Sequence, residues 1–231
     1  MTTIENNLQA VRARIAAACQ NAGRDVSHVQ LLAVSKTFAA SSVQQAFDAG
    51  QRDFGENYIQ EAVAKMAELA EIPAVWHCIG PIQGNKTRLV AEHFDWAQSV
   101  DRLKIAQRLS DQRPAHLAPL QVCIQVNTDG GPTKAGVTPE ALPELARAIS
   151  RLPRLRLRGL MTIPEPASDF AAACALHARA RALFDALNAD GLALDTLSMG
   201  MSADVEAAIH AGSNQVRVGT AIFGGRAGAT A

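Results

Sequence analysis

The amino-acid sequence predicts an α/β protein, a single (β/α)8 barrel of the TIM type that spans residues 1–231. Eight short and often continuously apolar segments alternate with segments whose apolar residues recur every three to four positions. This is the pattern of buried parallel strands that alternate with amphipathic helices. The length also fits, because such a barrel typically takes about 250 residues, whereas a doubly wound open sheet has about five or six strands.

The predicted elements follow one another regularly from the first helix to the last strand. The chain opens with an amphipathic helix whose apolar face carries Leu8, Val11 and Ile15. Helical spacing then recurs between the strands, for example at Leu142, Leu145 and Ile149. The predicted strands are 30–35, 53–55, 75–80, 96–99, 120–127, 155–162, 195–198 and 215–218.

Composition and charge narrow the classes of function. With 22 acidic and 22 basic residues, the chain has no net charge that would favour nucleic acid or an anionic membrane. No apolar run approaches the roughly 18 residues of a membrane span, and the amino terminus lacks the pattern of a signal peptide. We therefore expect a cytoplasmic protein whose partner is a small molecule.

The cysteines and histidines do not form a metal-binding pattern. Cys19, Cys78, Cys123 and Cys174 are spread along the chain without Cys-x-x-Cys spacing, which favours small buried side chains over a zinc site or disulfides. His77 lies in an apolar strand with no second ligand residue nearby, so a hydrogen-bonded core histidine is the better interpretation. The sequence predicts no metal site.

Lys36 stands at the carboxyl end of the first predicted strand. In a cleft there, burial would favour the neutral and nucleophilic amine, which makes Lys36 a candidate for a Schiff base. Of the other lysines, Lys65 and Lys104 are predicted on the polar faces of helices, Lys86 opens a helix and Lys134 lies in a loop. The alternative is a strand-end lysine that reaches solvent or pairs with a carboxylate.

Two loops near the end of the chain have the composition of a phosphate site. In a barrel, phosphate commonly binds at the loops after the seventh and eighth strands. The first loop contains Gly200, where the backbone can approach a ligand, and Ser202, which is predicted to begin the next helix. The second loop contains Gly219 and Thr220. Either loop alone could be a simple turn or cap, but the pair predicts a phosphate site.

Closure of the barrel would place Lys36 beside these loops, because the eighth strand neighbours the first. A ring that carries both an aldehyde and a phosphate could bridge them, and pyridoxal 5'-phosphate is such a molecule. Arg217, on the last predicted strand, could then face the pyridine nitrogen. Its permanent cation would oppose protonation of the ring and weaken it as an electron sink. The alternative for Arg217 is an ion pair at the barrel rim.

Six ordered segments resemble the pyridoxal phosphate homeostasis protein family: 33–37, 53–61, 76–86, 158–164, 197–204 and 216–224. The resemblance covers nearly the whole chain and implies a barrel like the cofactor domain of alanine racemase. It implies a monomer that buffers pyridoxal phosphate and supplies it to apo forms of other enzymes, without a turnover reaction of its own. The implied cofactor residues are Lys36 for the imine, Ser202, Gly219 and Thr220 for the phosphate, Arg217 for the ring nitrogen, and Asn57 as a further contact.

The chain departs from the family pattern at three places: Gly84, Thr162 and the loop 128–134. We expect none of them to touch the cofactor residues.

The alternative function is a pyridoxal phosphate-dependent amino-acid racemase. Racemisation by two bases needs an acid/base group on each face of the substrate, and barrel racemases place the second, a tyrosine, on an additional β-domain. We expect no such domain, because the chain ends about ten residues after Thr220, and Tyr58, the only tyrosine, is predicted at the start of a helix. A further alternative is a barrel that binds another phosphorylated metabolite, with Lys36 as a charge partner.

Overall fold

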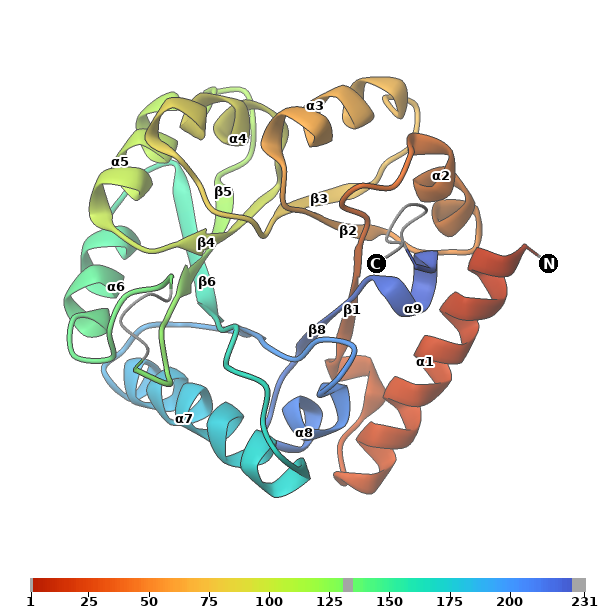
Figure 1. The fold of residues 1–231 in the computed structure, drawn as a ribbon. Coiled ribbons are helices and arrows are strands. Elements are labelled where there is room, and N and C mark those ends of the chain that lie inside the picture. The colour runs from red at the N-terminus through yellow and green to blue at the C-terminus, as the bar shows by residue number, and fades with distance from the viewer. Residues whose placement is uncertain (1, 131–134, 226–231) are drawn as a thin grey trace.

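The computed structural model describes residues 2–130 and 135–225, and within them eight parallel strands close into a barrel in chain order (Figure 1). The predicted fold class is therefore confirmed. The strands are β1 (Gln30–Val34), β2 (Asp53–Glu56), β3 (Val75–Cys78), β4 (Trp96–Val100), β5 (Leu120–Gln125), β6 (Leu155–Met161), β7 (Thr196–Ser198) and β8 (Gln215–Val218). Lys134 and the residues just before it in its loop, 131–133, lie outside the described residues.

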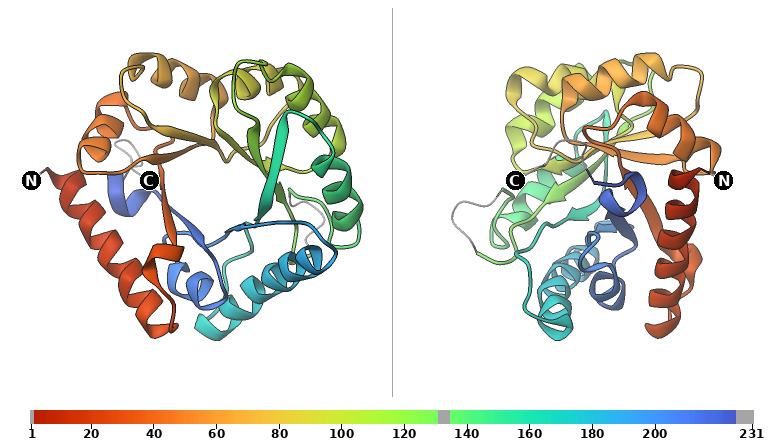
Figure 2. Two further views of the ribbon diagram at one scale, coloured as in Figure 1. Left: turned by 180° about the vertical axis from the view of Figure 1, so that it is seen from behind. Right: turned by 45° about the vertical axis from the view of Figure 1, so that its right-hand side comes forward.

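Helices form a ring around the strands, as the views in Figures 1 and 2 show. They are α1 (Thr3–Asn21), α2 (Ala40–Asp48), α3 (Ile59–Glu68), α4 (Thr87–His93), α5 (Leu103–Gln112), α6 (Leu142–Ser150), α7 (Phe170–Ala189), α8 (Val205–His210) and α9 (Thr220–Phe223), with short 3-10 turns at Val26–His28 and Gly84–Lys86. In the part of the chain that the structure describes, none of these helices is long and apolar enough to cross a membrane.

The strands end one or two residues earlier than predicted at several carboxyl ends. The segment predicted as 30–35, for example, ends at Val34, although Ser35 is also completely buried. Burial continues into the segments after the strands, as at Val126 after β5 and Thr162 after β6. Sequence pattern reports burial, and here burial extends beyond the hydrogen-bonded ladder.

The barrel closes where β1 pairs with β8, in a register that runs from Gln30 opposite Gln215 to Ala33 opposite Val218. The amino-terminal helix α1 covers this seam and lies beside α8 and α9 (Figure 1). A capping box at Thr2 and Glu5 begins α1, since each residue's side chain accepts a hydrogen bond from the other's backbone amide. The two ends of the described chain therefore meet around one pair of strands.

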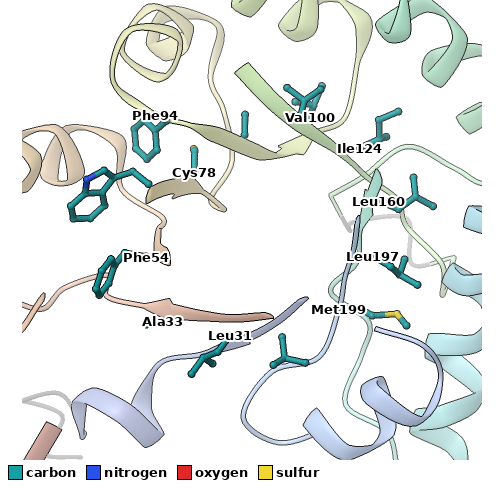
Figure 3. Close-up of a cluster of buried hydrophobic side chains, with 14 of the residues drawn as sticks. Leu31, Ala33, Phe54, Cys78, Phe94, Val100, Ile124, Leu160, Leu197 and Met199 are labelled. Atoms are coloured by element: carbon teal, nitrogen blue, oxygen red, sulfur yellow. The ribbon is translucent and has the colours of Figure 1, made fainter. Parts of the chain in front are cut away.

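Side chains alternate along each strand between the helix layer and the barrel interior. Leu31, Leu197 and Met199 belong to the apolar layer between strands and helices, which Figure 3 shows around the outside of the barrel. On β3, His77 is fully buried and contacts side chains of β2 and β4, which confirms its interpretation as a hydrogen-bonded core histidine. Among the described residues no cluster of potential ligands could hold a metal ion.

The buried cysteines give a prediction about thiol chemistry. Burial raises the pKa of the Cys78 and Cys123 thiols to about 12. Because the thiolate is the reactive form, both should resist iodoacetamide at pH 8, while the partly exposed Cys174 reacts faster. The difference in labelling rate between Cys174 and the two buried cysteines should become smaller as the pH rises toward 12. Peptide mass mapping of the labelled native protein measures this order, and equal labelling at pH 8 would contradict it.

Candidate functional site

Apart from Arg217, which lies within β8, the sequence-predicted site residues follow the carboxyl ends of strands, where barrels place their binding groups. Lys36 follows β1, Asn57 follows β2, and Gly219 with Thr220 follows β8. These three strands are neighbours, since β1 pairs with both β8 and β2. Beyond the ladder, the Ser35 amide still donates to the Gly55 carbonyl at 3.0 Å. Closure of the barrel thus brings together residues from the two ends of the sequence.

The turn that carries Lys36 packs directly against the segment after β8. A methyl group placed on Gly219 would lie 3.0 Å from the carbonyl oxygen of Val34, tighter than nearly all such contacts, so glycine favours the close approach of these two segments. One turn further on, the Phe38 ring stacks on Phe223 of α9 with 5.1 Å between ring centroids. The Lys36 turn and the Thr220 turn therefore form one packed unit.

Ser202 lies in a turn and does not begin a helix, so that prediction is wrong. Helix α8 starts at Val205, because the Asp204 carboxylate accepts a hydrogen bond from the Met201 amide at 2.6 Å and closes a separate turn. The Ser202 carbonyl accepts from Arg14 of α1 at 2.8 Å, whereas its hydroxyl makes no hydrogen bond to any described residue. The hydroxyl is therefore available to a ligand.

The loop after β7 is tied to β8 through Gly200. Its φ of 93° is in the left-handed region, which glycine adopts without strain. In this conformation its carbonyl accepts a hydrogen bond from the Arg217 amide at 3.0 Å. The two predicted phosphate loops are consequently held side by side.

Arg217 points into the barrel, where its side chain is almost fully buried. Its guanidinium donates to the Ser198 hydroxyl at 2.8 Å and to the Thr162 carbonyl at 2.7 Å. Burial lowers its pKa to about 10, so it remains a cation at neutral pH. None of its described neighbours forms an ion pair with it, which rules out the rim ion pair. The expectation that Thr162 stays clear of the cofactor residues is also wrong, since its carbonyl holds Arg217.

A chain of hydrogen bonds continues from Arg217 through the barrel interior. The Ser198 hydroxyl donates to Gln98 at 2.7 Å, and the Gln98 amide donates to Nδ1 of His77 at 2.9 Å. His77 in turn contacts the Asp53 carboxylate through Nε2 at 3.1 Å. Because a carboxylate accepts, His77 carries its hydrogen on Nε2. The hydrogen bonds of this chain then all run in the same direction, from Arg217 toward Asp53. Arg217 is held in one orientation by this chain.

Several polar groups near these residues have no partner within the described chain. The Lys36 amine is half-buried and makes no hydrogen bond or ion pair to a described residue, so no carboxylate in ranges 2–130 and 135–225 pairs with it. The Asn57 side-chain oxygen and the Thr162 hydroxyl are buried without a partner. Buried polar groups are normally hydrogen-bonded. An amine, an amide oxygen and a hydroxyl left free at one end of the barrel fit a polar ligand with an aldehyde.

Sequence reasoning missed the buried ion pair beside Lys36. Lys65, predicted on a polar helix face, has only 4% of its side chain exposed and contacts the fully buried Glu56 at 2.6 Å. Burial raises the pKa of Glu56, and the hydrogen bond and positive charge of Lys65 oppose that rise. The spacing of Lys65 from Ile59 and Ala62 on α3 could have revealed it, because these positions share the buried stripe.

Comparison with known proteins shows the family. The chain is 62% identical over 226 residues to the pyridoxal phosphate homeostasis protein of Pseudomonas aeruginosa, covering 98% of this chain and 97% of that protein. This chain belongs to the pyridoxal phosphate homeostasis protein family. The Escherichia coli K12 member of the family is 52% identical over 229 residues, covering 98% of both chains. A family model for the alanine racemase N-terminal domain matches residues 6–227.

A solved structure of a related protein has the same architecture. PipY of Synechococcus elongatus PCC7942, solved with PLP bound, has a TM-score of 0.83 and 39% sequence identity, covering 96% of this chain and 100% of that one. The relatives are named as homeostasis proteins and not as enzymes. The resemblance drawn from the six sequence segments is therefore confirmed at the level of family and fold.

Proposed function

We propose that this protein binds pyridoxal 5'-phosphate as an imine on Lys36, buffers the reactive aldehyde and supplies the cofactor to other enzymes. The observation that carries the proposal is the packing of the turn that holds Lys36 against the turn of Gly219 and Thr220 at the barrel seam. The Lys36 amine in this turn has no partner among the described residues. The presence of PLP in the PipY structure and the names of the close relatives support it. The barrel shared with racemases supplies the scaffold.

Each candidate residue has a separate task in this proposal. Lys36 would supply the amine that joins the cofactor aldehyde as an imine, with the aldehyde oxygen released as water. The Ser202 hydroxyl and the backbone amides near Gly219 and Thr220 hold the phosphate, which prefers several hydrogen-bond donors. Arg217 faces the ring nitrogen, and the free Asn57 oxygen contacts the cofactor from the β2 side.

The surroundings of Arg217 favour a carrier over a racemase. Its guanidinium is fixed by Ser198 and Thr162 and carries a full charge at neutral pH, so a ring nitrogen beside it would resist protonation. An unprotonated ring stabilises a carbanion poorly. Tyr58, the single tyrosine, is 56% exposed and its hydroxyl makes no hydrogen bond within the described chain, so it lacks the environment of a catalytic base.

The test of this function measures delivery and catalysis side by side. Mixing the cofactor-loaded protein with the apo form of a pyridoxal phosphate enzyme should restore that enzyme's activity. Incubating the loaded protein with L- or D-alanine in deuterated water should give no α-deuterium exchange above that of free cofactor, measured by NMR. Rapid exchange that disappears in the Lys36→Ala variant would overturn the carrier proposal and favour the racemase.

The phosphate assignment predicts a selective loss of affinity. Ser202→Ala should weaken binding of pyridoxal phosphate by about 1.5–3 kcal/mol, the range for a hydrogen bond to a charged group. Binding of unphosphorylated pyridoxal should be unchanged, because it lacks the group that Ser202 contacts. The matched control is Ser27→Ala, since Ser27 precedes β1 at the opposite end of the barrel. Equal titration curves for the Ser202→Ala variant and the wild type would place the phosphate elsewhere.

A further inference from the structure

The residue after Lys36 has a strained backbone. Thr37 has a φ of 67°, and it is the only residue other than glycine with a positive φ in the described ranges 2–130 and 135–225. A β-branched residue adopts this conformation only where its surroundings fix it, and such residues are found preferentially at functional sites. Here the Thr37 amide donates a 2.8 Å hydrogen bond to the Glu61 carboxylate of α3. The strained turn is thus anchored to a neighbouring helix.

The residue before Lys36 is anchored as well. The Ser35 carbonyl accepts a 2.9 Å hydrogen bond from the Lys65 ammonium, and the Ser35 hydroxyl donates to the Glu56 carboxylate at 2.6 Å. Ser35 and Glu56 are fully buried. Water therefore does not compete for these bonds, and the backbone on this side of Lys36 is held firmly.

Lys65 joins the two anchors. Its ammonium lies 2.6 Å from Glu56 and 3.5 Å from Glu61, the carboxylates that hold Ser35 and Thr37. One buried cation thereby connects both chain neighbours of Lys36 to α3. A buried ion pair of this kind is not strong evidence of stability by itself, because desolvation offsets most of its attraction. Its contacts on both sides of Lys36 point to a role in orientation.

We propose that Lys65, acting through Glu56 and Glu61, is a positioning residue that fixes the turn carrying Lys36 and directs its amine at the cofactor aldehyde. The proposal rests on the proposed function, in which Lys36 forms the imine. A displacement of about 1 Å in a reacting group can slow a reaction by about 100-fold. If the anchors serve orientation, their loss should slow imine formation and leave the noncovalent binding of the cofactor ring and phosphate intact.

The experiment compares two ligands on the same set of variants. Pyridoxal 5'-phosphate forms an imine, whereas pyridoxine 5'-phosphate has an alcohol in place of the aldehyde and binds only noncovalently. Glu61→Ala removes the acceptor of Thr37, Glu61→Gln keeps it, and Lys65→Met removes the cation at similar side-chain length. The matched control is Glu68→Ala, an exposed glutamate on the same helix. Stopped-flow absorbance gives the imine rate, and titration gives the pyridoxine phosphate affinity.

We expect Glu61→Ala to slow imine formation by about 10-fold or more, with pyridoxine phosphate affinity within about 2-fold of the wild type. Lys65→Met should show the larger effect, and Glu61→Gln and Glu68→Ala should behave as the wild type. Should Lys65→Met fail to fold, the two Glu61 variants decide, because 38% of the Glu61 side chain is exposed and we expect these variants to fold.

Two outcomes would overturn the positioning role: an unchanged imine rate in Glu61→Ala, or an equal loss for both ligands, which would indicate a purely structural ion pair. Borohydride reduction and peptide mapping of the wild type separate these results from failure of the proposed function. If the label lies on Lys36 while Glu61→Ala is normal, only the positioning proposal fails. If the label lies on another lysine, the imine assignment itself fails and the positioning proposal fails with it.

Discussion

Replacing Lys36 by alanine is expected to abolish the imine absorption band of the protein while the barrel stays folded. The side chain is half-buried at the end of β1 and has no partner among the described residues, so its removal costs little stability. Loss of the amine removes the only bond-forming group that the proposal assigns. Visible absorbance after addition of pyridoxal phosphate measures the band, and the unfolding temperature measures the fold.

The matched control for this variant is Lys104→Ala, since Lys104 is exposed on α5. It should keep the full absorption band. Borohydride reduction of the wild type should attach the cofactor to the peptide that contains Lys36. A label on Lys86 or Lys134, with Lys36 unmodified, would refute the assignment.

The largest effect on stability is expected at Gly159 in the middle of β6. A methyl group there would lie 1.6 Å from the Thr196 carbonyl oxygen, because Gly159 and Thr196 are direct partners between β6 and β7. Backbone cannot yield as a flexible side chain can, so Gly159→Ala must push two strands of the barrel apart. We expect a loss of about 3 kcal/mol or more in the free energy of unfolding.

Gly84→Ala is the control for this substitution, because nothing lies within 4 Å of the added methyl group. It should change stability by less than about 0.5 kcal/mol. For a chain of this size, the Gly159 variant should unfold about 6–12 °C below the wild type. Similar melting temperatures for the two variants would show that the β6–β7 spacing adapts without cost.

The barrel could be predicted from sequence because its signals are local. Each strand is a short apolar run, each helix has an apolar stripe, and eight repetitions of this unit leave few alternatives. The placement of Lys36 beside Gly219 then follows from closure alone, since β1 and β8 must pair. No single side-chain contact had to be known for this step.

The remaining features of the site depend on tertiary contacts that a sequence pattern does not carry. Lysine is a residue type that normally lies at the surface, and only the presence of Glu56 at the end of β2 makes the burial of Lys65 possible. The Ser202 turn ends before α8 because Asp204 folds back onto Met201, an interaction that competes with helix capping. The sequence predicts the strand of Arg217 correctly, but it does not predict the partners of Arg217, which are Ser198 on β7 and Thr162 directly after β6.

The pairing of β1 with β8 has a consequence for protein synthesis. Lys36 leaves the ribosome before Gly219, which lies 183 residues further along the chain. At about 5–20 residues per second, the interval is roughly ten to forty seconds. During this time a nascent chain has a lysine but no complete barrel around it. If Lys36 forms the imine as proposed, a stable complex with the cofactor should form only after the last strand has been made, and the cofactor should stabilise only completed barrels.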